Sequence, residues 1–181
     1  MKNAFLIGEK IYLRPIERED APLMQAFIND PEVTQTLCAH RPYSLQSEIE
    51  FIDQTNKDQN VIWLGIALKQ DERLIGSITL RGIQGKDRKG DFGIKIGVKE
   101  EWNKGYGTEA TKLIVRYGFE TLNLNRIFLR VFEYNLRAIR AYEKAGFRRE
   151  GLLRQDEYRM GRYWDVIVMG LLREDWDKLK G

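Results

Sequence analysis

The sequence has a single cysteine and a single histidine, Cys38 and His40, among its 181 residues. One cysteine cannot form a disulfide within the chain, and the two residues together supply too few ligands for a Cys/His zinc cluster. We therefore expect no bound metal and a reducing, cytoplasmic location.

Long apolar segments and the common hydrolase motifs are also missing. The longest apolar run, residues 61–68, is less than half the ~20 residues that a membrane-spanning helix needs. No basic segment followed by an apolar one opens the chain, and the motifs G-x-S-x-G, H-E-x-x-H and Gly-Lys-Ser/Thr after a phosphate loop do not occur. These absences predict a protein without a membrane span or secretion signal.

Charge of neither sign dominates the chain, whose formal net charge is +3. A value this small argues against a dedicated nucleic-acid binder. The charges are unevenly distributed, however: residues 1–60 carry six Lys/Arg against ten Asp/Glu, so the remainder is basic. One cleft could therefore bind an anion on one side and a cation on the other.

The composition is that of a globular protein, with 43% hydrophobic residues, 16 Gly and only 4 Pro. At a rule of roughly 150 residues per domain, we expect one domain over residues 1–181.

Hydrophobic periodicity predicts an α+β protein with a mixed, mostly antiparallel central sheet. A helix between the strands 92–98 and 126–132 would make a strand–helix–parallel strand unit. The expected strands are 10–16, 61–68, 74–80, 92–98, 126–132, 147–153 and 163–171, and the expected helices are 17–28, one from Ser44, one from Thr108, and 136–145.

The most informative segment is a glycine loop between a strand and a helix, in which Gly105 and Gly107 precede Thr108. Glycines permit close approach of the backbone to a ligand, and the free N–H groups of a helix N-terminus favour an anion. The segment is therefore a candidate pyrophosphate site. It could equally be a tight turn that needs glycine only for its φ angles.

Residues Gly105 to Ala110 also match the dinucleotide-binding fingerprint G-x-G-x-x-A. This match makes a nicotinamide- or flavin-dependent oxidoreductase the main alternative. In that fold the motif follows the first strand of a parallel sheet, whereas here antiparallel strands are predicted to precede it.

A second constellation consists of Asn135 and Tyr142, which are two helical turns apart and could face one groove. Read structurally, Asn135 is a helix N-cap and Tyr142 a half-buried core residue.

Together the two segments resemble the GNAT acetyltransferase superfamily, in its branch of ribosomal-protein N-terminal (RimJ/RimL-type), diamine and antibiotic acetyltransferases. The resemblance covers nearly the whole chain, from the Leu13-Arg14-Pro15 opening through the glycine loop to Gly146-Phe147. Many members have Gln or Arg where this chain has Trp102. The resemblance implies a single GNAT-like domain with helices on both faces of the sheet.

The resemblance further implies that acetyl-CoA is the acetyl donor. Its implied binding residues are Ile96 and Val98 on the strand, Asn103, Lys104, Gly105, Tyr106, Gly107 and Thr108 in the loop, and Asn135 on the following helix. Tyr142 would act as general acid toward the thiol leaving group, starting from a hydrogen bond to sulfur.

The acceptor implied by the family is a primary amine, on a protein N-terminus, a polyamine or a small molecule, to which the acetyl group is transferred directly. Glu133 is our candidate for the base that deprotonates this amine, with Asp91 and Glu157 as alternatives. A backbone N–H near Val98 would stabilise the oxyanion. Asp30 and Glu32 would lie beside an acceptor entrance that favours a cation.

Aromatic residues of the last hairpin, Tyr158, Tyr163 and Trp164, are candidates for shaping the acceptor pocket or for core packing. We expect neither nucleic-acid nor membrane partners, and a homodimer is compatible with the resemblance. A third class of function is a catalytically silent acyl-CoA-binding module, which would keep the phosphate loop and lose the acid. The presence of Tyr142 argues against it.

Overall fold

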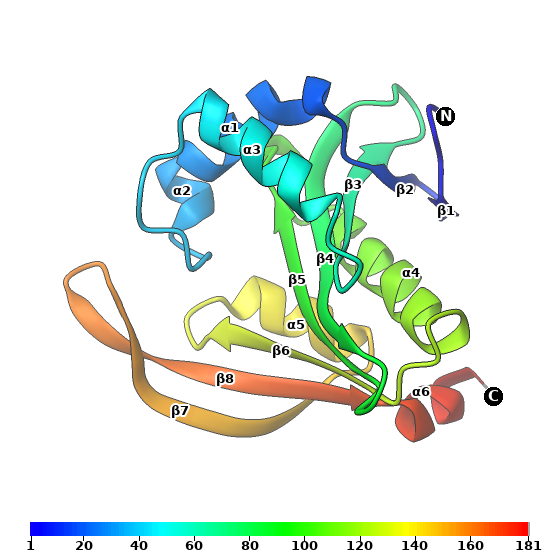
Figure 1. Ribbon diagram of the computed structural model, residues 1–181. Helices are drawn as coiled ribbons and strands as arrows, with labels where there is room; N and C mark the ends of the chain where they lie inside the picture. The colour runs from blue at the N-terminus through cyan, green and yellow to red at the C-terminus, as the bar shows by residue number, and fades with distance from the viewer. Residues whose placement is uncertain (181) are drawn as a thin grey trace.

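The computed structural model describes residues 1–180 and has a twisted eight-stranded sheet at its centre, in the order β1-β2-β3-β4-β5-β6-β8-β7 (Figure 1). The strands are β1 (Leu6–Ile7), β2 (Ile11–Pro15), β3 (Ile62–Leu68), β4 (Leu74–Gln84), β5 (Lys89–Ile96), β6 (Arg126–Phe132), β7 (Arg148–Arg159) and β8 (Arg162–Leu172). The helices are α1 (Ala21–Asn29), α2 (Pro31–Thr34), α3 (Leu45–Thr55), α4 (Tyr106–Glu120), α5 (Leu136–Lys144) and α6 (Arg173–Lys180), with 3₁₀ turns η1 (Arg18–Asp20) and η2 (Lys99–Glu101).

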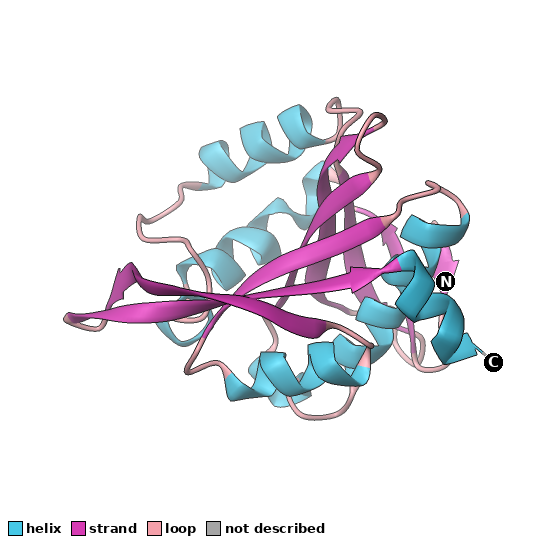
Figure 2. Ribbon diagram, turned by 90° about the horizontal axis from the view of Figure 1, so that it is seen from below, coloured by secondary structure: helices cyan, strands magenta, loops and turns pink. Residues whose placement is uncertain are grey.

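The helices cover both faces of the sheet (Figures 1 and 2). One face of the sheet packs mainly against α4, around a core that includes Ile78, Ile114 and Phe119. The opposite face of β3 and β4 packs under α1 and α3, where Met24 and Ile52 belong to a smaller core. No helix within residues 1–180 is long and apolar enough to cross a membrane.

The strand pairing confirms the mixed sheet predicted from the periodicity. β2, β3, β4 and β5 form an antiparallel series, and β6 pairs antiparallel with β8. The crossover through α4 makes β5 and β6 parallel, as the strand–helix–strand pattern predicts.

The parallel pair is short, and its shortness creates the main opening of the fold. β5 and β6 pair only from Lys89 with Arg126 to Asp91 with Phe128. Beyond these residues β5 remains bonded to β4 as far as Ile96, whereas β6 follows β8. The two strands therefore diverge and leave a wedge in the sheet.

The last hairpin is longer than the sequence pattern predicts, because the apolar alternation ends near Leu153 although β7 continues to Arg159. Its turn uses two residues with positive φ, Met160 (51°) and Gly161 (78°), which suits a two-residue hairpin turn. The tip of this hairpin projects beyond the rest of the sheet (Figure 1).

The C-terminal helix α6 was not predicted. Its Trp176 packs against Phe119 of α4 with ring centroids 5.2 Å apart. Acidic residues in its first turn and lysines in its last turn are the usual signature of a helix and could have revealed it.

Candidate active site

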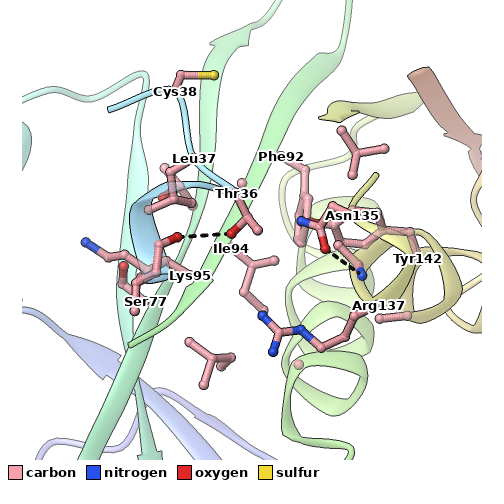
Figure 3. A pocket seen from close by; sticks show the side chains of 18 of the residues that line it. Thr36, Leu37, Cys38, Ser77, Phe92, Ile94, Lys95, Asn135, Arg137 and Tyr142 are labelled. Carbon is pink, nitrogen blue, oxygen red and sulfur yellow. Dashed lines mark hydrogen bonds between the residues drawn. The ribbon is translucent and has the colours of Figure 1, made fainter. Parts of the chain in front are cut away.

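A pocket of about 1120 Å³ occupies the wedge between β5 and β6, and we call it the wedge pocket. It is lined by both strands, the start of α4, one face of α5, part of α3, and the segment after α2. Asn135, Arg137 and Tyr142 lie on one side of it, and Ser77 and Lys95 on the other (Figure 3). We call these the cofactor side and the acceptor side.

The glycine loop forms one end of the cofactor side. Gly105 has a φ of 90°, which a residue with a side chain adopts only with strain, and it is the N-cap of α4. The first intrahelical bond runs from the Glu109 N–H to the Gly105 carbonyl at 3.0 Å. The N–H groups of Tyr106, Gly107 and Thr108 therefore have no acceptor within the helix.

Open space lies in front of these N–H groups. A Cβ added to Gly105 or Gly107 would meet no atom within 4 Å, and both residues line the pocket, together with Asn103, Tyr106 and Thr108. The glycines are thus not needed to make room for another part of the chain. The arrangement fits a phosphate group bound by backbone N–H groups at a helix N-terminus.

Lys104 is the one residue of the predicted loop that the structure does not bring into the pocket. Its Nζ lies 2.9 Å from the carboxylate of Glu101, which also accepts from Arg73 at 2.6 Å. These contacts hold Lys104 beside η2, so a direct role in cofactor binding stays a prediction.

Trp102 connects the loop to α5. Its indole N–H donates to the Ile96 carbonyl at 2.9 Å, and the Arg137 guanidinium lies 3.8 Å from its ring centre. Burial lowers the pKa of Arg137, which lines the pocket near the glycine loop. Trp102 thereby holds a cation where an anionic cofactor would bind.

We expect Trp102→Gln to weaken acetyl-CoA binding by about 2- to 30-fold, less than a variant that blocks the glycine loop. A cation–π contact contributes about 0.5–2 kcal/mol, and the backbone N–H groups of the loop remain in the variant. Isothermal titration calorimetry of the wild type and the variant would measure the change. A loss in affinity as large as that caused by blocking the glycine loop would contradict this ranking.

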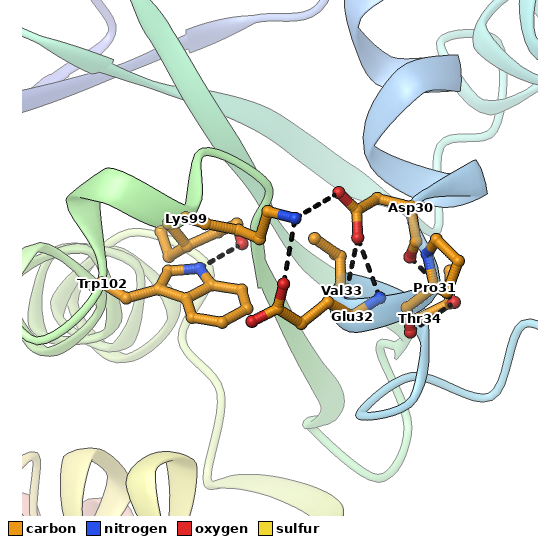
Figure 4. A network of polar contacts seen from close by, with 8 residues as sticks. Asp30, Pro31, Glu32, Val33, Thr34, Lys99 and Trp102 are labelled. Carbon is orange, nitrogen blue, oxygen red and sulfur yellow. Dashed lines mark hydrogen bonds and ion pairs between the residues drawn. The ribbon is translucent and has the colours of Figure 1, made fainter.

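Asp30 and Glu32 both form ion pairs with Lys99 (Figure 4). Lys99 Nζ is 2.9 Å from Asp30 and 3.0 Å from Glu32, and these contacts raise the pKa of Lys99 to about 12. Asp30 also caps α2 by accepting from the Glu32 and Val33 N–H groups. The two carboxylates thus make an ion-pair network, and neither lines the pocket.

Asn135 and Tyr142 both line the cofactor side, as their spacing predicts, and both also have structural roles. The Asn135 side chain caps α5 by accepting from the Ala138 N–H at 3.2 Å. Tyr142 is 7% exposed, and its ring packs edge-on against Phe92 with centroids 5.6 Å apart. Burial raises the pKa of Tyr142 and keeps its phenol protonated, so that it can donate a proton.

The structure does not bring Glu133 into the pocket. Glu133 is exposed, and its carboxylate accepts from the Asp165 N–H at 3.3 Å. Asp91 and Glu157, the two alternatives, both line the pocket. Burial raises the pKa of Asp91, opposed by Arg81 at 3.1 Å. The geometry therefore favours these alternatives over Glu133.

The end of β5 differs from the expectation for the oxyanion site. The N–H groups of Gly97 and Val98 both donate to the Ile75 carbonyl, at 2.8 and 3.2 Å, so neither is free. Ile96 lines the pocket, but Val98 does not. Between Asp91 and Ile96, β5 is paired with β4 on one side only. Every second N–H of this part of β5 therefore points toward the wedge and has no strand partner there.

The aromatic residues of the last hairpin do not line the pocket. Tyr158 and Tyr163 form an exposed edge-on pair with centroids 5.1 Å apart, and the Trp164 N–H donates to the Arg159 carbonyl at 2.9 Å. Any part they play in acceptor recognition stays a prediction.

The glycine loop follows the fifth strand of a mostly antiparallel sheet, which is not the setting of a dinucleotide fingerprint. A family profile described as "Acetyltransferase (GNAT) domain" matches residues 10–148. The chain belongs to the GNAT acetyltransferase family. It is accordingly an N-acetyltransferase that uses acetyl-CoA as donor, and the free N–H groups and open glycines of the loop fit the pyrophosphate of that cofactor.

Similar proteins span almost the full length of this GNAT chain. An uncharacterized N-acetyltransferase, p20, of Bacillus licheniformis is 31% identical over 175 residues, covering 94% of this chain and 97% of the relative. The spermidine N(1)-acetyltransferase of Escherichia coli is 31% identical over 170 residues, covering 93% and 89%. The spermidine N-acetyltransferase of Vibrio cholerae, solved with CoA and spermine, superposes with a TM-score of 0.85 at 28% identity, covering 92% and 98%.

Proposed function

We propose that this acetyltransferase moves the acetyl group of acetyl-CoA directly to a primary amine bound in the wedge pocket. The observation that supports this most strongly is that one pocket is lined both by the free N–H groups at the start of α4 and by Tyr142. A donor bound to the loop can therefore reach the phenol without leaving the pocket.

The residues proposed to bind the cofactor follow from this placement. The loop residues Asn103, Gly105, Tyr106, Gly107 and Thr108 would hold the pyrophosphate through backbone N–H groups. The pantetheine arm of acetyl-CoA would run past Ile96 and Asn135, along the unpaired edge of β5. Its amide groups would hydrogen-bond to that edge as a neighbouring strand does.

The proposed chemistry removes two protons from the acceptor nitrogen and delivers one to the leaving sulfur. A base takes a proton from the acceptor ammonium, and the neutral nitrogen attacks the thioester carbonyl. As the C–S bond breaks, Tyr142 delivers its proton to the sulfur, and the second proton lost by the acceptor nitrogen restores the phenol. A phenol of pKa ~10 is a weaker acid than a thiol of ~8.5, so the proton can move only as negative charge builds up on the sulfur during C–S cleavage.

Asp91 is the base that the geometry supports best. It lies at the last pair between β5 and β6, where the wedge opens, and it is adjacent in sequence to Phe92, which packs on Tyr142. Its raised pKa makes its carboxylate a better proton acceptor than an ordinary aspartate.

We expect Asp91→Asn to lower kcat/KM by about 10²-fold or more, in the range of general base catalysis. The wild-type rate should fall as pH drops through the raised pKa of Asp91, because only the ionised carboxylate accepts a proton, and this inflection should disappear in the variant. A pH profile of kcat/KM for both proteins measures this. A larger loss in Glu133→Gln than in Asp91→Asn would assign the base to Glu133 instead.

Relatives named for spermidine acetylation make a polyamine one candidate acceptor, beside a protein N-terminus and small amines. The proposed function is tested by measuring thiol release from acetyl-CoA with each amine class, together with mass spectrometry of the product. We expect an N-acetylated amine and one free thiol per product. Thiol release with no acetylated amine in any class would contradict the proposal.

A further inference from the structure

Three polar side chains of the acceptor side have no partner among the described residues. Ser77 of β4 and Lys95 of β5 lie directly opposite each other in the sheet, and Glu48 comes from α3. All three line the pocket, and Ser77 and Lys95 lie together in it (Figure 3). Within residues 1–180, neither a hydrogen bond nor an ion pair satisfies the hydroxyl, the ammonium or the carboxylate.

Glu48 and Ser77 are buried and Lys95 is half-buried, and the polar tips of all three reach the pocket. Glu48 is 3% and Ser77 4% exposed. The fully enclosed polar atoms without a partner in residues 1–180 are Tyr12 Oη and Arg159 Nε, which leaves the tips of the three pocket residues open to the cavity. Burial raises the pKa of Glu48 and lowers that of Lys95, and each charge partly opposes the shift of the other.

A purely structural ion pair would have a different geometry. The largely buried pair Arg14 and Asp20 shows how this chain builds one, with two hydrogen bonds at 2.8 and 2.7 Å. Lys95, by contrast, has no carboxylate within 4.0 Å among the described residues. Charged and polar groups that face an open pocket are satisfied by water or by a bound molecule. The pocket thus holds an ammonium, a hydroxyl and a carboxylate that a bound molecule can satisfy.

The chemistry of the three groups selects the ligand. An ammonium beside a hydroxyl binds a carboxylate, whereas the nearby Glu48 accepts an N–H. A polyamine offers only cationic groups, so it would leave Lys95 unpaired and be repelled by it. A molecule with both an amine and a carboxylate satisfies all three side chains.

We propose that the acceptor amine also carries a carboxylate, as a free amino acid does, and that Lys95 and Ser77 bind this carboxylate. The inference rests on the proposed amine acetylation and specifies its substrate class. Gly93 lies between Asp91 and Lys95 on the same face of β5 and also lines the pocket, where the Arg81 guanidinium is 3.5 Å from the position of a Cβ at Gly93.

The test compares each amino acid with its carboxamide, which lacks the negative charge of the carboxylate, and adds two polyamines. The panel contains the twenty standard amino acids, their carboxamides, putrescine and spermidine, and thiol release from acetyl-CoA gives kcat/KM for each. We expect the best acceptor to be a free amino acid, at least ~10-fold better than its own carboxamide, the difference that a charge-assisted contact supports. A carboxamide has the more acidic ammonium, so intrinsic reactivity works against this result.

Variants of Lys95 assign the preference to the proposed group. Lys95→Met should remove the discrimination between amino acid and carboxamide without changing the affinity for acetyl-CoA, and Lys95→Arg should keep it. Lys112→Met, an exposed position of α4, is the matched control and should behave as the wild type. Thermal unfolding would show whether Lys95→Met is folded, and Ser77→Ala, which should weaken the preference, provides a second measurement.

The outcomes separate the two proposals. The inference is overturned if carboxamides or spermidine match or exceed the best amino acid in the wild type, or if Lys95→Met keeps the full discrimination. Acetylation of amines without a carboxylate would then leave the proposed function standing. Acetylation of no amine at all would contradict the proposed function itself.

Discussion

Replacing Tyr142 by phenylalanine should lower turnover by about 10²- to 10⁴-fold, the usual contribution of general acid catalysis. The ring remains, so its packing against Phe92 and the affinity for acetyl-CoA should be kept. Only the hydrogen bond to the leaving sulfur and the proton that it delivers are lost. Steady-state kinetics at saturating amine, together with calorimetric binding of acetyl-CoA, would measure both quantities.

Tyr12→Phe is the matched control, because Tyr12 is fully buried, lies outside the pocket, and has a hydroxyl without a partner within residues 1–180. Turnover of this variant should equal that of the wild type. Because burial raises the pKa of Tyr142, the wild type should not lose activity through its ionisation at pH ~10, where an ordinary tyrosine titrates. Turnover of Tyr142→Phe within a few-fold of the wild type would remove the acid from the mechanism.

Valine at Gly107 should weaken acetyl-CoA binding by roughly 100-fold or more, or about 2.7 kcal/mol. The added side chain would occupy the open space in front of the α4 N–H groups, where the phosphates are proposed to bind. It meets no atom of the chain within 4 Å of its Cβ, so the fold should be retained. Calorimetry with acetyl-CoA and a thermal unfolding curve would separate lost binding from lost structure.

The control for this variant is Gly151→Val on β7. A Cβ at Gly151 also meets nothing within 4 Å, but the residue lies outside the pocket. Its affinity for acetyl-CoA should be unchanged. Equal affinities of Gly107→Val and the wild type would show that the phosphates bind elsewhere.

The parts of the site that could be predicted are those encoded locally. The glycine loop is continuous in sequence, and Asn135 and Tyr142 lie on one short helix, where spacing alone sets their common face. The strand–helix–strand unit has equally local signals, and the structure confirms the parallel pair that it predicts.

The acceptor side depends on contacts between distant segments and could not be predicted in this way. Glu48 on α3 and Lys95 on β5 are 47 residues apart in the sequence, and only the folded chain brings both to one pocket. The wedge arises because β5 and β6 stop pairing after Asp91 and Phe128, whereas β6 stays paired with β8. No local sequence pattern indicates where this pairing stops. Glu133 illustrates the same limit: it lies near the end of β6 as expected, but it points away from the pocket and toward Asp165.

The central claim is that donor and amine occupy two sides of one pocket at the same time, so that the acetyl group passes directly between them. Initial velocities measured over a grid of acetyl-CoA and amine concentrations test this most directly. Direct transfer within a ternary complex predicts double-reciprocal lines that intersect. Parallel lines, the pattern expected when a covalent acetyl-enzyme forms and CoA is released before the amine binds, would contradict direct transfer.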